Sequence, residues 1–215
     1  MERMKPSPIV IVGCGPGSAD YLTPAALNAV KGAQVILGAQ RLLDLFPTAR
    51  AERIGLNTGV EELLKAMEDR LGRQRMTVLV SGDPGVFSLA RFVIRRFGPN
   101  LCRVIPGISS VQVAFARLGL NWDDAHIMSA HKGDAAANPC PRGARKIAIL
   151  GGNRGAMRRI ARPFLEGASG SWRIFVFENL ALEEEFTLEV APRELEALDI
   201  APRSVVLIIR GELLP

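Results

Sequence analysis

Residues 76–120 read MTVLVSGDPGVFSLARFVIRRFGPNLCRVIPGISSVQVAFARLGL. Two short apolar runs in this stretch, Thr77–Val80 and Leu101–Ile105, each lead into a Gly/Pro turn and then into a helical pattern. Two consecutive strand–turn–helix units predict parallel strands joined by a helical crossover. Both turns then lie at the carboxyl ends of their strands, the edge where open α/β sheets bind ligands. We therefore predict that the turns 81–85 and 106–110 form one wall of a cofactor cleft.

Length and composition indicate a soluble globular protein of one large or two small domains. The chain has 215 residues, of which 48% are hydrophobic and 23% are charged. No apolar run approaches the roughly 20 residues that span a bilayer, so we expect no membrane association. After Leu120 the helical pattern ends in a polar turn, Asn121–Asp124. We predict an N-terminal α/β domain over residues 1–120 and a C-terminal α/β domain over residues 121–215.

Cysteine and histidine usage argues against a metal site. The three cysteines, Cys14, Cys102 and Cys140, are far apart in the sequence, and the chain has only two histidines. Without a CxxC pair, a structural zinc site or a disulfide framework is not expected. A reducing cytoplasm is the compartment that fits this pattern best.

The positive charge bears on the class of partner. The net charge is +5 and the pI is about 9.6. Most of the 27 Lys and Arg residues are expected to form a solvated surface, and some to attract an anionic partner. One Tyr and two Trp provide few stacking platforms for single-stranded nucleic acid. A small polyanionic substrate is therefore favoured over nucleic acid.

The glycine-rich loop Gly13–Ser18 invites comparison with a dinucleotide-binding fingerprint. The GxGxxG pattern requires glycine where Ser18 stands, and the acidic residue expected about 20 positions further on is missing. A nicotinamide cofactor is therefore not expected. The alternative interpretation is a tight strand-to-helix connection, which the glycines alone would explain.

Local signals predict most of the remaining elements. Thr23-Pro24 and Asp83-Pro84 each have a capping residue followed by proline, the pattern of a helix start. Ser109 or Ser110 is expected to cap a further helix. Gly82 and Gly107 remove side chains beside strand ends, which would allow close approach of a ligand. Further strands are predicted at 9–12, 35–37, 51–56, 126–129, 146–150, 173–177, 185–190 and 204–209.

Three motif segments of the sequence together resemble a known family. They are GCGPGSADYLTPAAL at 13–27, VSGDPGVFSLAR at 80–91 and VIPGISSVQVAFARLGL at 104–120. In this order and spacing they resemble the tetrapyrrole (precorrin) methyltransferases, most nearly those that methylate C5 of precorrin or cobalt-precorrin in cobalamin biosynthesis. The resemblance extends to Arg41–Leu43, Ser129–Gly133 and Glu178–Leu180, and thus covers nearly the whole chain.

The resemblance implies a fold, a cofactor and a set of contacts. The family fold has two α/β domains, each with a mixed, mostly parallel sheet flanked by helices, and an active site in the inter-domain cleft. Members bind S-adenosylmethionine without a Rossmann-type glycine loop. Several relatives have an acidic residue after the second strand, but Gly38-Ala39 stands here, so no catalytic acid or base is assigned there. The implied cofactor contacts are Pro16, Ser81, Gly82, Asp83, Val86, Ser109, Ser110, Leu150 and Leu180.

The implied substrate is a large ring that carries many carboxylates. Arginine holds carboxylates bidentately, so basic residues after strand ends are the natural contacts. The expected substrate contacts are Gly15, Arg41, His131 and Lys132. His131 is also a candidate for a base that removes a proton after methyl transfer, although a lone histidine near a loop is more often structural. Cys14 is expected to be a buried filler and not a nucleophile.

Three alternatives stay open at this point. The chain resembles a C5-methyltransferase, but the motifs also fit a methyltransferase for another ring carbon or for a different scaffold such as a diphthine precursor. A non-catalytic tetrapyrrole-binding module is the alternative from another class. From the family we expect a homodimer. Decarboxylation and C15 methylation would then belong to a separate subunit, because the chain ends just after its last predicted strand.

Overall fold

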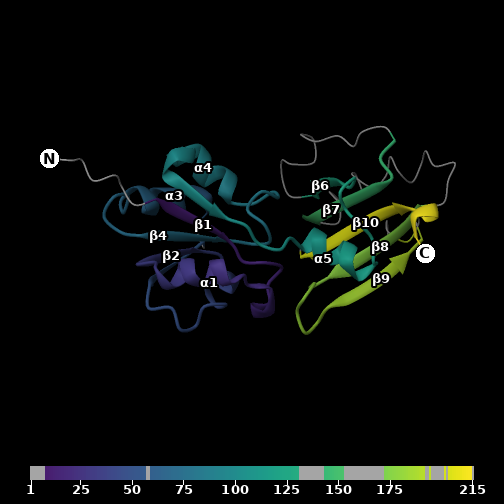
Figure 1. The fold of residues 1–215 in the computed structure, drawn as a ribbon, viewed down its shortest axis with the longest axis horizontal. Coiled ribbons are helices and arrows are strands. Elements are labelled where there is room, and N and C mark those ends of the chain that lie inside the picture. The colour runs from purple at the N-terminus through teal and green to yellow at the C-terminus, as the bar shows by residue number, and fades with distance from the viewer. Residues whose placement is uncertain are drawn as a thin grey trace. The chain divides into compact units, whose positions relative to one another are not determined.

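A computed structural model of the chain describes residues 8–56, 59–130, 143–152, 172–191, 194, 201 and 203–214. The chain divides into two compact α/β units, residues 1–109 and 110–215, and each unit holds one five-stranded sheet (Figure 1). The sequence placed the division after Leu120. Helix α5 (Ser110–Arg117) groups with the second unit instead, because it packs on strand β10 (Ser204–Arg210).

The first sheet is parallel throughout its described strands. Its order is β3-β2-β4-β1-β5. The parallel arrangement confirms the prediction from residues 76–120, but β4 and β5 are not neighbours, because β1 lies between them. The elements of this unit are β1 Ile9–Gly13, η1 Ala19–Tyr21, α1 Pro24–Lys31, β2 Val35–Gly38, α2 Gln40–Leu43, β3 Glu52–Gly55, α3 Val60–Glu68, β4 Met76–Val80, α4 Ala90–Phe97, η2 Pro99–Leu101 and β5 Cys102–Ile105.

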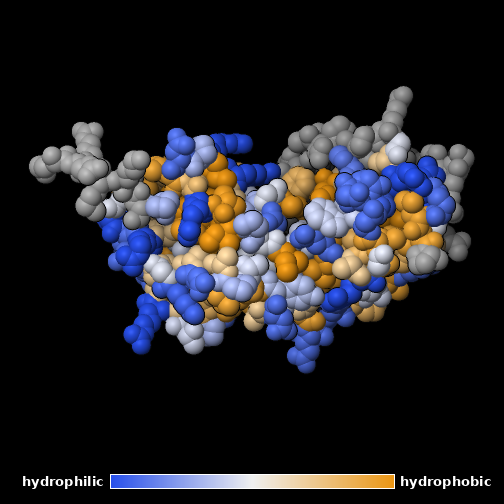
Figure 2. Space-filling view, viewed as in Figure 1, coloured by the Kyte–Doolittle hydropathy of each residue, from blue (hydrophilic) through white to orange (hydrophobic). Residues whose placement is uncertain are grey.

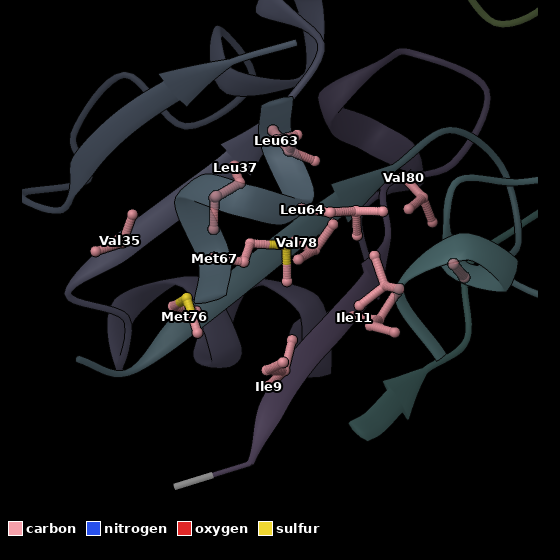
Figure 3. Packing of buried hydrophobic residues seen from close by; sticks show 12 residues of the cluster. Ile9, Ile11, Val35, Leu37, Leu63, Leu64, Met67, Met76, Val78 and Val80 are labelled. Carbon is pink, nitrogen blue, oxygen red and sulfur yellow. The ribbon is translucent and has the colours of Figure 1, made fainter. Parts of the chain in front are cut away.

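Side chains that alternate along the strands of this sheet pack into two hydrophobic clusters, one on each face. Ile9 and Ile11 of β1 join the cluster that α3 and α4 complete, and Figure 3 shows Leu63, Leu64 and Met67 of α3 in this cluster. The other cluster contains Val12 with residues of α1 and α2. Because successive strand residues point to opposite faces, a β-branched run buried on both faces forms the centre of a parallel sheet.

Helix α1 begins as its sequence predicts. The Ala26 N–H donates to Thr23 Oγ1 at 3.1 Å, Pro24 occupies the first helical position, and Gly32 is the C-cap. The Thr23 hydroxyl thus satisfies one of the N–H groups that a helix start leaves without a partner. These local contacts fix where α1 begins, after the first glycine loop and η1.

Part of the positive charge forms ion pairs on the surface. Arg96 of α4 pairs with both Glu61 and Glu68 of α3, at 2.9 and 2.6 Å. Arg70 pairs with Glu52 of β3 at 2.7 Å. Figure 2 shows hydrophilic residues over α4 at the upper edge of the first unit. These arginines therefore belong to the solvated surface that the composition predicts.

The second sheet is mixed, with the order β6-β7-β10-β8-β9. Only β6 and β7 pair in parallel among its described strands, whereas the sequence led us to expect a mostly parallel sheet. The reason for one antiparallel pair is local, since β8 and β9 follow each other through a short turn and form a hairpin. The strands of this unit are β6 His126–Ala130, β7 Lys146–Gly152, β8 Trp172–Glu178, β9 Phe186–Val190 and β10 Ser204–Arg210, and η3 Gly211–Leu213 follows.

Candidate functional site

The loops after β1 and β4 pair with each other at the carboxyl edge of the first sheet. Gly15 and Gly82 form an antiparallel bridge. The Gly82 N–H donates to the Gly15 carbonyl at 2.8 Å, and the Gly15 N–H donates to the Gly82 carbonyl at 3.3 Å. The Cys14 N–H donates to the Val80 carbonyl at 2.9 Å. The first glycine loop is therefore a tight connection fastened to the end of β4.

Two glycines allow the loops after β1, β4 and β5 to approach one another. A Cβ on Gly107 would lie 2.5 Å from the Gly82 carbonyl oxygen and 2.6 Å from the Gly13 carbonyl carbon. A Cβ on Gly13 would lie 2.5 Å from the Gly107 nitrogen. We expected Gly107 to leave room for a ligand, but neighbouring backbone fills this space. Its role here is to bring three strand ends together.

Asp83 joins the turn after β4 to the turn after β5. The Gly85 N–H donates to Asp83 Oδ1 at 2.7 Å, and the Gly107 N–H donates to Asp83 Oδ2 at 3.1 Å. Hydrogen bonds to an ionised carboxylate are stronger than neutral ones. One side chain thus holds both turns of the predicted cofactor wall, and both turns lie at the same edge of the sheet.

The prediction that Asp83-Pro84 starts a helix is wrong. Helix α4 begins at Ala90, and residues 84–87 form turns instead. The Asp83 oxygens bind Gly85 and Gly107 in place of a helix N-terminus, and Ser88 Oγ accepts the Ala90 N–H at 3.1 Å. The segment before α4 therefore stays open as a loop at the sheet edge.

The predicted cofactor contacts of the first unit gather at this edge. Ser81 is exposed, whereas Gly82, Asp83 and Val86 are half-buried. Ser109, which lies in the turn after β5 and directly precedes α5, is 6% exposed. Pro16, in the first glycine loop, is also half-buried. These residues come from three separate segments that β1, β4 and β5 bring to one edge.

Cys14 has the environment of an inert thiol. Its side chain is fully buried, and its Sγ donates to the Val12 carbonyl at 3.7 Å. Burial raises the pKa of Cys14 to about 12, although the charge of Arg41 opposes this shift. A buried thiol with a raised pKa is a poor nucleophile. The expectation that Cys14 is a small filler is confirmed.

Alkylation should distinguish Cys14 from Cys102. With a pKa of about 12, roughly one Cys14 thiol in 10⁴ would be ionised at pH 8. We expect iodoacetamide to label Cys102 in the folded protein but to label Cys14 only after denaturation, as read by peptide mass mapping. Equal labelling rates for both cysteines in the folded protein would contradict the buried environment of Cys14.

Arg41 stands on the short helix α2, and Arg53 of β3 holds that helix in place. The Arg53 guanidinium donates to the Leu43 carbonyl at 3.3 Å and to the Phe46 carbonyl at 2.6 Å. No side chain caps the start of α2. The Arg53 bonds connect the other end of the helix to β3 of the sheet. Arg41 is exposed, and its charge acts on Cys14 in the first glycine loop. An exposed guanidinium beside this loop can bind an anion.

The second unit holds the other predicted contacts. Ser110 is the first residue of α5, Leu150 lies half-buried within β7, and Leu180 lies in the turn after β8 with 4% of its surface exposed. Two further predicted contacts, His131 and Lys132, lie outside the described residues. The sequence therefore stays the only basis for their roles.

Gly13 and Glu185 make contacts that the sequence did not predict. The sequence signal for Gly13 is its place at the end of the buried apolar run that forms β1. The ion pair of Glu185 was not predictable from local sequence, because its partner Arg117 lies 68 positions earlier in the chain. Contacts over such a distance depend on the tertiary fold.

Asp83 keeps unused acceptor capacity, and the described residues include neither a metal-binding cluster nor a membrane-spanning helix. No group of His, Cys, Asp and Glu side chains able to hold a metal ion occurs among them. No described helix has the length and apolar character to cross a membrane. Asp83 is a half-buried carboxylate with about four acceptor positions, and the two backbone N–H groups use only part of this capacity. The edge can therefore still accept hydrogen bonds from the hydroxyl or ammonium groups of a ligand such as S-adenosylmethionine.

Comparison with known proteins places the chain in a family. The family model for Tetrapyrrole (Corrin/Porphyrin) Methylases matches residues 8–196. The chain is 33% identical to the cobalt-precorrin-7 C(5)-methyltransferase of Salmonella typhimurium, over 82% of this chain and 87% of that protein.

Solved structures share this fold. The precorrin-6Y methylase of Archaeoglobus fulgidus matches with a TM-score of 0.71 and 26% identity, over 95% of this chain and 98% of that chain. The uroporphyrin-III C-methyltransferase of Thermus thermophilus, in complex with S-adenosylhomocysteine, matches with a TM-score of 0.73 and 21% identity, over 94% and 97% of the two chains. From the family match over most of its length, and from a relative that is 33% identical over 82% of the chain, we conclude that the chain belongs to the tetrapyrrole (corrin/porphyrin) methylases.

Proposed function

We propose that this protein is an S-adenosylmethionine-dependent methyltransferase that methylates C5 of a precorrin or cobalt-precorrin ring in cobalamin biosynthesis. The observation that carries the proposal is the 33% identity, over 87% of its length, to a relative named for C5 methylation of cobalt-precorrin-7. The structural neighbour named as a precorrin-6Y methylase supports the same substrate class.

The cofactor would lie against the loops at the carboxyl edge of the first sheet. Gly82 and Ser109 would lie against it, and the remaining acceptor capacity of Asp83 would bind its polar groups. Val86 and Pro16 would supply apolar contact. Ser110, Leu150 and Leu180 are the other cofactor contacts that the resemblance to the family implies. Bound S-adenosylmethionine would supply the activated methyl group.

The protein itself needs little acid–base chemistry for this reaction. An electron-rich ring carbon attacks the methyl group, so the main requirement is to hold the two reactants in line. Proximity and orientation can supply roughly 7–11 kcal/mol of the barrier without a catalytic dyad. The two turns fixed by Asp83 give the rigid support that such alignment requires.

The ring would be held through its carboxylates. Arg41 is the described residue that suits this role, because it is exposed beside the first glycine loop and Arg53 fixes its helix. Gly15, His131 and Lys132 would complete the substrate contacts. His131 would also be available as the base that removes a proton after transfer.

Turnover with the ring substrate tests this function. Purified protein is incubated with cobalt-precorrin-7 and S-adenosylmethionine that carries a ¹³C-labelled methyl group. We expect the product mass to rise by one labelled methyl replacing hydrogen, and NMR to locate the label on C5. A label on another ring carbon would assign the chain to a different branch of the family. Cofactor binding without any transfer to a panel of precorrins would favour a non-catalytic binding module.

The proposal extends to assembly and compartment. We propose a homodimer that works in the cytoplasm alongside a separate decarboxylating C15-methyltransferase subunit. Free Cys14 and Cys102 in the described residues agree with a reducing compartment. Light scattering of the purified protein tests the dimer, since a monomer mass at micromolar concentration would contradict it.

A further inference from the structure

The turn after β8 has an unusual backbone. Asn179 and Ala181, on either side of the buried Leu180, have φ angles of +50° and +64°. The left-handed region costs a residue with a Cβ about 1 kcal/mol, with asparagine tolerating it better than alanine. Such a conformation persists where surrounding contacts enforce it. The contacts around this turn therefore fix the position of Leu180 and would affect the binding of any ligand that touches it.

The carboxylate of Glu185 is hydrogen-bonded to this turn. The Ala181 N–H donates to Glu185 Oε2 at 2.7 Å, and the Glu185 N–H donates to the Leu182 carbonyl at 3.1 Å. The Leu182 N–H donates in turn to the Asn179 carbonyl at 2.9 Å. Glu185 therefore bonds directly to the residue with the more strained backbone.

The same carboxylate binds helix α5. Arg117 Nε donates to Glu185 Oε1 at 2.6 Å, and Arg117 Nη2 donates to Glu185 Oε2 at 2.9 Å. This bidentate pair is only partly exposed, with 40% of the Arg117 side chain and 21% of the Glu185 side chain accessible. Bidentate arginine–carboxylate pairs fix direction as well as distance. Since α5 begins at Ser110, the pair links the helix of one predicted cofactor contact to the turn of another.

We propose that Arg117 and Glu185 are positioning residues whose ion pair holds the 179–182 turn against α5 and thereby sets the affinity for the cofactor. The proposal rests on the proposed function, in which Ser110 and Leu180 contact S-adenosylmethionine. Neither Arg117 nor Glu185 needs to touch the ligand. A rigid binding surface avoids the cost of ordering a loop on binding, so loss of the pair weakens binding through the turn.

The chain offers a matched control in the same hairpin. Arg173 of β8 and Glu189 of β9 form a second bidentate pair, at 2.6 and 2.7 Å. The two arginines are similarly exposed, at 42% for Arg173 and 40% for Arg117, but Glu189 is more exposed than Glu185, at 45% against 21%. The control pair joins two strands and makes no described bond to the turn. Loss of the Arg173–Glu189 pair therefore reports the effect of removing an ion pair from this hairpin without removing a bond to the turn.

The test compares Glu185→Gln with Glu189→Gln. S-adenosylhomocysteine affinity is measured by calorimetry at a temperature where circular dichroism shows both variants folded. We expect Glu185→Gln to raise the dissociation constant about ten-fold, as for loss of a charge-assisted hydrogen bond. Glu189→Gln should stay within about two-fold of the wild type, because exposed pairs contribute little. Arg117→Gln should reproduce the effect of Glu185→Gln, and the double variant should add nothing further.

Equal affinities for the Glu185→Gln and Glu189→Gln proteins would overturn the inference while leaving the proposed function intact. If the wild-type protein does not bind S-adenosylhomocysteine, the proposed function fails on its own. Hydrogen exchange of the 179–182 amides then still tests the hold on the turn. Faster exchange in Glu185→Gln, but not in Glu189→Gln, supports that hold, and equal exchange in the two variants contradicts it.

Discussion

The Asp83→Asn variant is expected to bind S-adenosylhomocysteine about 100-fold more weakly than the wild-type protein. Both carboxylate oxygens of Asp83 accept backbone N–H groups, one from Gly85 and one from Gly107. An amide has one acceptor oxygen, so its NH₂ group would face one of these donors. The variant would lose the link between the two turns with almost no change in side-chain volume. Calorimetric titration with S-adenosylhomocysteine measures the effect.

A control variant separates this effect from a general change of charge. Asp69 is an exposed carboxylate at the end of α3, so Asp69→Asn should bind the ligand as the wild-type protein does. Circular dichroism at the titration temperature shows that both variants are folded. Unchanged affinity in Asp83→Asn would mean that the turns after β4 and β5 do not carry the cofactor site.

The Gly107→Ala variant is expected to destabilise the first unit by about 3 kcal/mol or more. The added methyl would lie within 2.7 Å of three backbone atoms, from Gly82 and Gly13. Backbone atoms at the ends of paired strands cannot move aside as a flexible side chain can. Relief therefore requires separation of strand ends that the sheet holds together. Urea denaturation followed by circular dichroism measures the change in the free energy of unfolding.

Gly32 provides the matched control for this substitution. It ends α1 with a φ of −83°, and a Cβ there would come no closer than 3.7 Å to its nearest atoms. Gly32→Ala should therefore be neutral or stabilise by up to about 1 kcal/mol, because alanine restricts the unfolded chain. If the two variants unfold at the same urea concentration, close packing of the three loops is not what Gly107 provides.

Local patterns in the sequence predicted most of the elements that position the site. The β-branched run 9–12 forms a buried strand, and Thr23-Pro24 starts a helix through its own side chain. Both elements depend on contacts within a few residues, so the local sequence is enough to predict them. The parallel arrangement also followed, because a helix between two strands reverses the chain direction.

Features that depend on distant residues could not be read from the sequence. The pattern Asp83-Pro84 suits a helix start, but the Gly107 N–H competes for the same carboxylate and α4 begins later. The insertion of β1 between β4 and β5, and the antiparallel pairs of β10, depend on strand order. Strand order is decided by tertiary packing, which no local pattern encodes.

A crystal structure with bound S-adenosylhomocysteine tests the central claim most directly, namely that the loops after β4 and β5 bind the cofactor. We predict that the ligand contacts Gly82, Asp83 and Ser109, and that Glu185 lies outside its contact shell while bonded to Ala181. A ligand extended along the loop Gly13–Ser18 in the manner of a dinucleotide, without contact to the turn after β4, would contradict the account.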